Sequence, residues 1–169
     1  MSNTENKVLL NVKNLHTGFA TDDGQVKAVR GISIHVDQGE SLGIVGESGC
    51  GKSVSMLSIM HLLADNASLT ADEINFDGED LLHKSVKEMR KYQGNDISMI
   101  FQDPMTSLHP LFTIGEQICN PLMRHRKLTK KEALERAVEV LDQVGIPDPK
   151  KRLKQYPHEL SGGMRQRVM

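Results

Sequence analysis

The chain has 169 residues, a formal net charge of −1 and 25% charged residues, which is the composition of an ordinary globular protein. The near-neutral charge, the absence of tryptophan and the 4% aromatic content weigh against a general nucleic-acid-binding surface. The two cysteines give no disulfide framework, and the most apolar stretch is too short to cross a bilayer. We therefore expect a folded domain of a reducing compartment, whose role at a membrane would depend on a partner.

The first part of the chain is predicted to form a loose tail over residues 1–7 and then an antiparallel hairpin. Residues 8–15 alternate apolar and polar side chains, as a half-buried strand does. Residues 25–36 resume strand character after a turn cluster at 21–24. The hairpin leads into an apolar run over residues 41–45, which has the length of a buried strand.

A glycine-rich loop follows this expected strand and precedes an expected helix over residues 54–63. Its residues fit the pattern G-x-x-x-x-G-K-[ST] of the phosphate-binding P-loop, in the strand–loop–helix context that the motif requires. Glycines let successive N–H groups point inward, and the helix N-terminus favours an anion. We expect Lys52 to reach the β- and γ-phosphates of a nucleoside triphosphate and the Ser53 hydroxyl to ligate Mg²⁺. The residues predicted to bind the triphosphate are Gly46, Glu47, Ser48, Gly49, Cys50, Gly51, Lys52 and Ser53.

The segment between this loop and residue 101 is predicted to be mixed in structure. The helix over 54–63 is apolar almost all round, so we expect it to be buried. Residues 65–72 are expected to form a loop, 73–76 a short strand and 85–92 a short helix. Residues 97–101 read as a second buried strand.

Gln102 stands directly after that second strand. In doubly wound sheets the carboxyl ends of the strands are where ligands bind. A glutamine amide there can offer its carbonyl to Mg²⁺ or orient an attacking water, so Gln102 is predicted as a metal ligand and as a catalytic group beside Lys52. Taken alone, a glutamine at a strand end is more often ordinary polar surface.

The remainder of the chain is predicted to be helical. Residues 113–123 fit one helix, and Thr129 with Glu132 forms a capping box at the start of another, which Gly145 ends. Residues 148–158 read as a polar connection. The sequence then predicts one more helix start.

Leu160-Ser161-Gly162-Gly163 is that helix start. Ser161 is a good N-cap residue, and the two glycines leave the backbone N–H groups accessible to an anion. Taken alone, the tetrapeptide is more often an ordinary glycine-rich cap. The P-loop upstream and the intervening Gln102 favour a second phosphate contact.

Three motifs together resemble those of a known family. Residues 46–53, Gln102 and residues 160–164 are similar in order and separation to the Walker A, Q-loop and signature motifs of the ATP-binding subunits of ABC transporters. Residues 101–108 (Phe-Gln-Asp-Pro-Met-Thr-Ser-Leu) and 115–118 (Gly-Glu-Gln-Ile) resemble more narrowly the bacterial oligopeptide and dipeptide importers, and within them the D-type subunit.

The resemblance, which covers roughly residues 8–169, implies an α/β fold. It would be a P-loop NTPase (RecA-like) core with an N-terminal antiparallel β subdomain and a helical subdomain, incomplete because the sequence stops inside the signature helix. Residues 8–104 would form the β subdomain and core, and 105–169 the helical subdomain. The family's Walker B strand, catalytic Glu and switch His would follow Met169. We therefore expect the chain alone to be inactive as an ATPase and prone to aggregate, because its core strands would lack a partner.

The resemblance also implies ligands and a mechanism. ATP and Mg²⁺ would be held between the P-loop of one subunit and the signature helix of a second ATPase subunit, in a head-to-tail pair. Ser161, Gly162 and Gly163 would then contact the γ-phosphate held by the partner. Phe19 is a candidate for stacking on adenine, although a core phenylalanine at a strand end is an equally open interpretation.

The implied partners place the chain at a membrane. The helical segment after Gln102 would face a transmembrane permease, and a periplasmic or extracellular solute-binding protein would act indirectly. The expected location is the cytoplasmic face of the inner membrane, as a peripheral subunit, with no nucleic-acid partner. The solute cannot be read from the sequence, and peptides are the favoured class.

Three other classes of protein share parts of this pattern. A P-loop GTPase would carry an N-K-x-D motif, but the nearest match, Asn6-Lys7-Val8-Leu9, lacks the Asp and precedes the P-loop. A nucleoside kinase would not need residues 160–163. A non-transport ABC-type ATPase that acts on nucleic acid or ribosomes shares the signature motif and stays as the alternative, although the near-neutral charge and residues 101–108 favour the importer.

Overall fold

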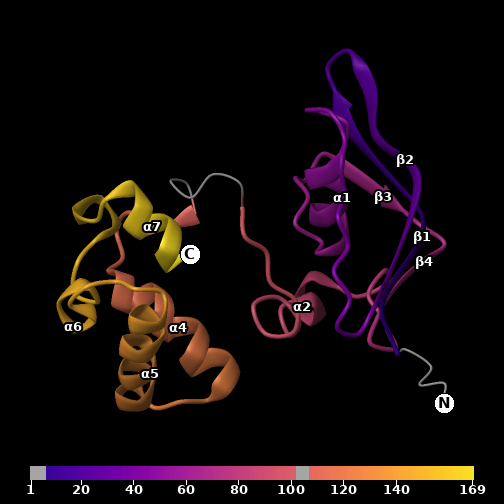
Figure 1. Cartoon of the computed structure of the whole chain (residues 1–169). Helices are drawn as coiled ribbons and strands as arrows, with labels where there is room; N and C mark the ends of the chain where they lie inside the picture. Colours follow the sequence, from indigo (N-terminus) through magenta and orange to yellow (C-terminus); the bar gives the residue numbers. More distant parts are fainter. Residues whose placement is uncertain (1–6, 102–106) are drawn as a thin grey trace. The chain divides into compact units, whose positions relative to one another are not determined.

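The computed structural model describes residues 7–101 and 107–169 (Figure 1). The chain divides into two compact units, Met1–Gln93 and Gly94–Met169, which we call the sheet unit and the helical unit. The predicted boundary between residues 104 and 105 lies outside the described residues.

An antiparallel hairpin forms the first part of the sheet unit. Strand β1 (Val8–Thr21) pairs with β2 (Gly24–Asp37) along nearly its whole length, with Val12 opposite Ile34. The Thr21 hydroxyl donates to the Gly24 carbonyl at 2.7 Å and closes the turn. The predicted hairpin is confirmed, and its first strand extends well beyond residue 15.

Three short strands complete the sheet on the other side of β1. Strands β3 (Ala67–Thr70) and β4 (Glu73–Phe76) both pair antiparallel with β1, and β5 (Glu79–Asp80) pairs with β4. The predicted strand over 73–76 is confirmed, whereas the prediction of a loop over 65–72 was wrong. That stretch has few apolar side chains, and its strand character comes from pairing with the long β1, because tertiary context outweighs weak β-propensity.

The core of the sheet unit lies between the sheet and the short helices. Helix α1 (Lys52–Ile59) contacts β1 and β2, and α2 (Val86–Met89) begins with a capping box between Ser85 and Glu88. Both helices are shorter than the sequence predicts. The buried apolar side chains of this unit are Val12, Leu15, Val29, Ile34, Ile59, Met60, Ile74, Leu81 and Met89.

Two predicted buried strands do not form. Residues 41–45 and 97–101 are not part of the sheet, and only an isolated bridge occurs at Ile97. Val45 is 94% exposed and Ile100 is 77% exposed. The prediction was wrong for this structure because a strand requires a ladder partner, and neither segment has one among the described residues.

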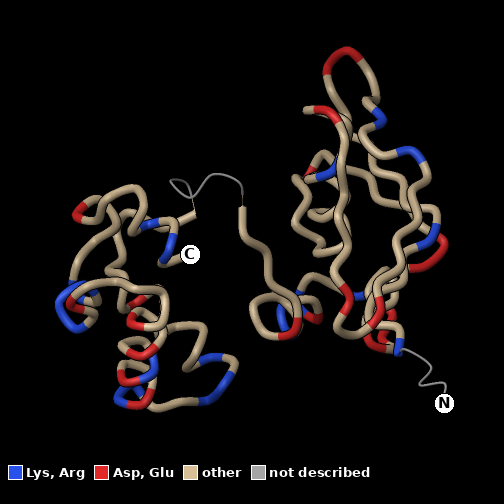
Figure 2. The backbone as a smooth tube through the Cα atoms, in the orientation of Figure 1, with Lys and Arg blue, Asp and Glu red and all other residues tan. Residues whose placement is uncertain are grey.

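The helical unit begins with two capped helices that pack against each other (Figure 1). Helix α4 (Ile114–Arg126) and α5 (Lys130–Gln143) start with the capping boxes Thr113–Glu116 and Thr129–Glu132, so both predicted helices are confirmed. Acidic and basic residues recur along α5 (Figure 2), while Ala133, Ala137 and Leu141 are buried. No helix in the described part of the chain is long and apolar enough to cross a membrane.

Three shorter helices follow in the same unit. Helix α6 (Pro149–Arg152) and the 3₁₀ helix η1 (Pro157–Glu159) lie within the segment predicted as a polar connection, and α7 (Gly162–Val168) confirms the predicted helix start. The Gly115 N–H donates to the Leu153 carbonyl at 2.8 Å, which holds the chain after α6 against α4. The core of this unit consists of Ile114, Cys119, Ala133, Ala137, Leu141, Ile146, Leu153 and Leu160.

Candidate functional site

The glycine loop over residues 46–53 is closed by the side chain of Lys52. The Lys52 ammonium donates to the carbonyl oxygens of Gly46 and Glu47, each at 2.7 Å. The Cys50 sulfur lies 3.5 Å from the same nitrogen. Since Lys52 is the first residue of α1, its side chain reaches back across the loop and places a cation inside it.

Two glycines of the loop occupy positions that other residues would not fit. Gly49 and Gly51 have φ angles of 80° and 97°, in the left-handed region that favours glycine. A Cβ on Gly51 would also lie 2.6 Å from the Ala28 carbonyl oxygen. The glycine at position 51 is therefore required both by its backbone conformation and by the close approach of β2.

Helix α1 begins without a side-chain cap. Its N-cap residue is Gly51, and its first turn contains no acidic residue. The first-turn N–H groups and the positive end of the helix dipole therefore remain available to an anion. Ser53 is exposed in this same turn, where its hydroxyl oxygen is suited to a hard cation such as Mg²⁺.

Buried hydroxyl groups attach α1 to the sheet. Ser58 donates to the Val54 carbonyl at 2.7 Å, and the Thr17 hydroxyl of β1 lies 2.7 Å from the Ser58 oxygen. Because Ser58 uses its own proton within the helix, Thr17 is the donor of the second bond. Ser55 likewise donates to the Gly51 carbonyl at 2.9 Å. The sequence predicts that this helix is apolar almost all round. It does not show that two serines, Ser55 and Ser58, lie on the buried face.

The structure places Phe19 in the long strand β1. Phe19 is half-buried in β1, opposite Val26 of β2 and Ala67 of β3. Its stacking on adenine stays a prediction. Gln102, the predicted metal ligand and catalytic group, lies outside the described residues.

The predicted signature residues form an exposed helix start in the helical unit. The Ser161 hydroxyl accepts a hydrogen bond from the Met164 N–H at 3.3 Å, and α7 begins at Gly162. A Cβ on Gly162 or Gly163 would meet no atom within 4 Å, so the backbone here is open. Arg167 donates to the carbonyl oxygens of Val144 and Gly145, which fixes α7 to the end of α5.

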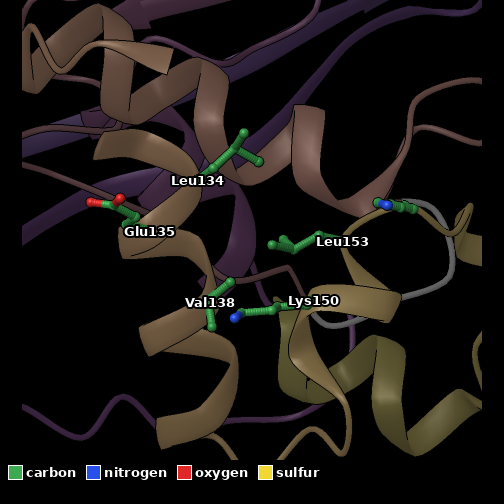
Figure 3. A pocket seen from close by; sticks show the side chains of 6 residues that line it. Leu134, Glu135, Val138, Lys150 and Leu153 are labelled. Atoms are coloured by element: carbon green, nitrogen blue, oxygen red, sulfur yellow. The ribbon is translucent and has the colours of Figure 1, made fainter. Parts of the chain in front are cut away.

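The helical unit also carries a groove that the sequence analysis missed. Leu134 and Val138 of α5 face Leu153 and Lys150 across a cavity of about 500 Å³, which Lys154 also lines (Figure 3). The floor of this groove is apolar, two lysines stand at its rim, and Glu135 also lines it. The available signal was the spacing of Leu134 and Val138 on one face of a helix.

The groove continues toward the start of α5. Lys130, Met123 and Cys119 line an adjoining cavity of about 480 Å³, together with Leu134 and Lys154. Burial raises the pKa of the Cys119 thiol, so it is protonated and contributes an uncharged wall. We call this surface, defined by Lys130, Leu134, Val138, Lys150, Leu153 and Lys154, the α5 groove.

The chain is similar in sequence to proteins of known role. A family model described as "ABC transporter" matches residues 29–169. The dipeptide transport ATP-binding protein DppD of Bacillus subtilis is 54% identical over 162 residues, which cover 95% of this chain and 48% of that protein. The oligopeptide transport ATP-binding protein OppD of Escherichia coli is 50% identical over 161 residues, which cover 95% of this chain and 48% of that protein. The chain thus spans about half the length of these relatives.

Solved structures of ABC transporter cassettes are also similar to this chain. The dimeric structure of MJ0796, a bacterial ABC transporter cassette, aligns with a TM-score of 0.81 and 26% identity over 95% of this chain and 66% of that one. A dimeric post-hydrolysis state of MJ0796 bound to ADP and Pi gives the same values. The chain therefore belongs to the ABC transporter family and has the fold of its ATP-binding cassette.

Proposed function

We propose that this chain is the ATP-binding part of a subunit that drives peptide import through a membrane permease. The observation that carries the proposal is the loop over residues 46–53, which Lys52 closes and which opens onto the uncapped first turn of α1. The relatives named for dipeptide and oligopeptide transport support peptides as the solute class.

In this proposal each group of the loop has a separate role toward ATP. The loop and first-turn N–H groups bind phosphate oxygens, and Lys52 transfers its hydrogen bonds from the Gly46 and Glu47 carbonyls to the β- and γ-phosphates. Ser53 and Gln102 ligate Mg²⁺, while Phe19 stacks on adenine. Gln102 also orients the attacking water.

A second ATPase subunit would complete the site. The open backbone at Ser161, Gly162 and Gly163 would contact the γ-phosphate held by the P-loop of the partner subunit. The solved dimers of the similar cassette MJ0796 support such a pair.

The α5 groove would receive the permease. The floor of the groove is apolar, and Lys130, Lys150 and Lys154 outnumber the two glutamates, Glu116 and Glu135, that also line the two cavities. This lining suits a short cytoplasmic loop that presents an apolar side chain beside a carboxylate. This contact would hold the subunit peripherally at the cytoplasmic face of the inner membrane. A solute-binding protein would then act on the permease from the other side.

Sedimentation with membrane vesicles tests this assignment. Vesicles that contain the permease are expected to retain the chain, and the groove variant Val138→Asp is expected to lower the retained fraction at least about tenfold, because a carboxylate would be desolvated in the contact. Val86→Asp is the matched control, since Val86 is 66% exposed on α2 in the sheet unit.

Two results would contradict the assignment. One is equal retention by vesicles of pure phosphatidylcholine whether or not they contain the permease. The other is full retention of the Val138→Asp variant. Salt-sensitive binding to nucleic acid, in place of binding to the permease, would favour the non-transport ATPase instead.

A further inference from the structure

The end of the α4–α5 hairpin concentrates positive charge. Residues 124–131 carry five of the 21 Lys and Arg residues of the chain and none of its 22 Asp and Glu residues. The 16 basic residues elsewhere are outnumbered by those 22 acids, so the rest of the chain has a net charge of −6. Figure 2 shows the blue segments gathered at this end of the hairpin. We call this surface the basic tip; it consists of Arg124, Arg126, Lys127, Lys130 and Lys131.

The charges of the basic tip are only weakly offset within the hairpin, where Lys130 has an electrostatic interaction with Glu116 but no ion pair. All five side chains are exposed, and none forms an ion pair within the described part of the chain. The nearby carboxylates of Glu116 and Glu132 are engaged by the hydroxyls of Thr113 and Thr129 in the capping boxes. The tip therefore presents unpaired cations to the solvent.

The placement of two lysines increases the positive electrostatic potential of the basic tip. Lys130 and Lys131 stand in the first turn of α5, at the positive end of its dipole, where acidic residues are the favourable ones. Arg124 and Arg126 stand in the last turn of α4, which tolerates cations well. An external anionic surface would relieve the repulsion at the start of α5.

The apolar side chains near the tip turn away from the solvent. Leu122, Met123 and Leu128 pack against the core of the helical unit. Residues 124–131 contain no Phe, Tyr or Trp on which a nucleic-acid base could stack. Binding at the tip would thus be electrostatic and without insertion, which fits a surface of phosphate headgroups better than a single-stranded nucleic acid.

We propose that the basic tip binds the anionic phospholipid headgroups of a bilayer. Each Lys or Arg near such a surface raises the partition coefficient about fivefold, and the attraction falls off within about 8 Å at physiological salt. The contact needs neither nucleotide nor permease. Lys130 belongs to both the tip and the α5 groove, so a bilayer at the tip would lie beside the surface assigned to the permease.

Vesicle sedimentation of the full chain tests the proposal. The chain is expected to bind vesicles that contain phosphatidylglycerol, to bind pure phosphatidylcholine vesicles weakly, and to dissociate at high salt. The variant R124Q/R126Q/K127Q/K131Q leaves Lys130 intact and is expected to lower the partition coefficient about 600-fold. The smaller variant R126Q/K127Q, expected to lose about 25-fold, serves if the fourfold variant loses its circular dichroism signal.

The matched control removes four exposed cations from the sheet unit. The variant K27Q/K87Q/R90Q/K91Q has the same net charge as the fourfold tip variant and is expected to bind within about twofold of the unmodified chain.

Four outcomes would overturn the proposal. The fourfold tip variant and the fourfold control have the same net charge, so equal losses of vesicle binding in the two would mean that only net charge matters. Unchanged binding of the tip variants would remove the tip from the contact. Equal binding to phosphatidylcholine would mean an apolar contact. Tip-dependent binding to polyglutamate or duplex DNA, without binding to vesicles, would identify an acidic protein or a nucleic acid as the partner.

Discussion

Thr17 and Ser58 connect the helix that follows the glycine loop over residues 46–53 to the rest of the sheet unit. Both hydroxyls are buried, and their 2.7 Å hydrogen bond joins β1 to α1, the helix that carries Lys52 and Ser53. A buried hydroxyl that loses its partner incurs the full cost of its desolvation, whereas the net contribution of an intact hydrogen bond is smaller. The hydrogen bond therefore holds α1 on β1 mainly because the Thr17 hydroxyl would be buried without a partner if Ser58 were removed.

A double-mutant cycle measures this coupling. Ser58→Ala is expected to lower the free energy of unfolding by about 1–3 kcal/mol, because it leaves the Thr17 hydroxyl buried without an acceptor. Thr17→Val should cost less, since Ser58 keeps its bond to the Val54 carbonyl. Urea denaturation followed by circular dichroism gives the values, and the double variant is expected to lose less than the sum of the single variants. Strict additivity would contradict the account.

The sequence predicted the positions of single residues better than their partners. The motif placed Lys52 in a loop directly before a helix expected from residue 54, and the structure begins that helix two residues earlier, at Lys52 itself. The motif could not show that Lys52 bonds to the Gly46 and Glu47 carbonyls, because those contacts depend on the curvature of the whole loop. The Thr17–Ser58 bond was equally invisible, since it joins residues that are far apart in the chain.

Helices that begin with capping residues were predicted correctly from the sequence, whereas strands that depend on pairing with distant segments were not. The capping box of Thr129 and Glu132 marked the start of α5 in the sequence, because such a box is completed within four residues. The helix predicted from residue 113 also forms, and the structure adds a capping box at Thr113. Strand β3 and the segments 41–45 and 97–101 were predicted wrongly. Their structure depends on which other segment lies beside them, and composition carries little of that information.

The capping boxes predict a pH dependence of the helical unit. Hydrogen bonds from Thr113 and Thr129 lower the pKa values of Glu116 and Glu132 below the ordinary value of 4.5. A carboxyl group with a lowered pKa in the folded chain stabilises the fold above its unfolded pKa, and this contribution disappears as the pH falls through the folded value. Helicity should therefore decrease on acidification below about pH 4.5.

Circular dichroism at 222 nm during an acid titration measures this effect. The variant E116Q/E132Q keeps hydrogen-bonding groups at the third helical positions but has no carboxyl to titrate there. It should therefore lose less helicity on acidification than the unmodified chain. The control E135Q/E139Q removes two exposed carboxyls of α5 for which no such cap exists. Identical titration curves for all three proteins would count against the assigned role of the caps.

At the scale of the whole molecule, the family could be predicted and the arrangement of the sheet could not. The three motifs are short and local, and the matched family and the cassette structures confirm the family and the fold that they imply. The parallel core expected around residues 41–45 and 97–101 is not formed within the described part of the chain, which leaves Val45 and Ile100 open to solvent. Each unit instead closes a core from its own side chains.

The surfaces of the molecule were also beyond the sequence analysis. The α5 groove is lined by residues from two helices and the segment after them, so its shape appears only once they pack. The basic tip could have been read from the run of cations over residues 124–131, but its exposure and its lack of internal ion pairs depend on the fold.

The loop over residues 46–53 is expected to bind ATP through Lys52. Isothermal titration of the chain with ATP in the presence of Mg²⁺ tests it most directly, with Lys52→Ala as the variant and Lys87→Ala, an exposed lysine of α2, as the control. Loss of charge-assisted hydrogen bonds worth about 1.5–3 kcal/mol should weaken binding roughly 10- to 150-fold in Lys52→Ala and leave Lys87→Ala unchanged. ATP binding of equal strength in Lys52→Ala and the unmodified chain would contradict the account.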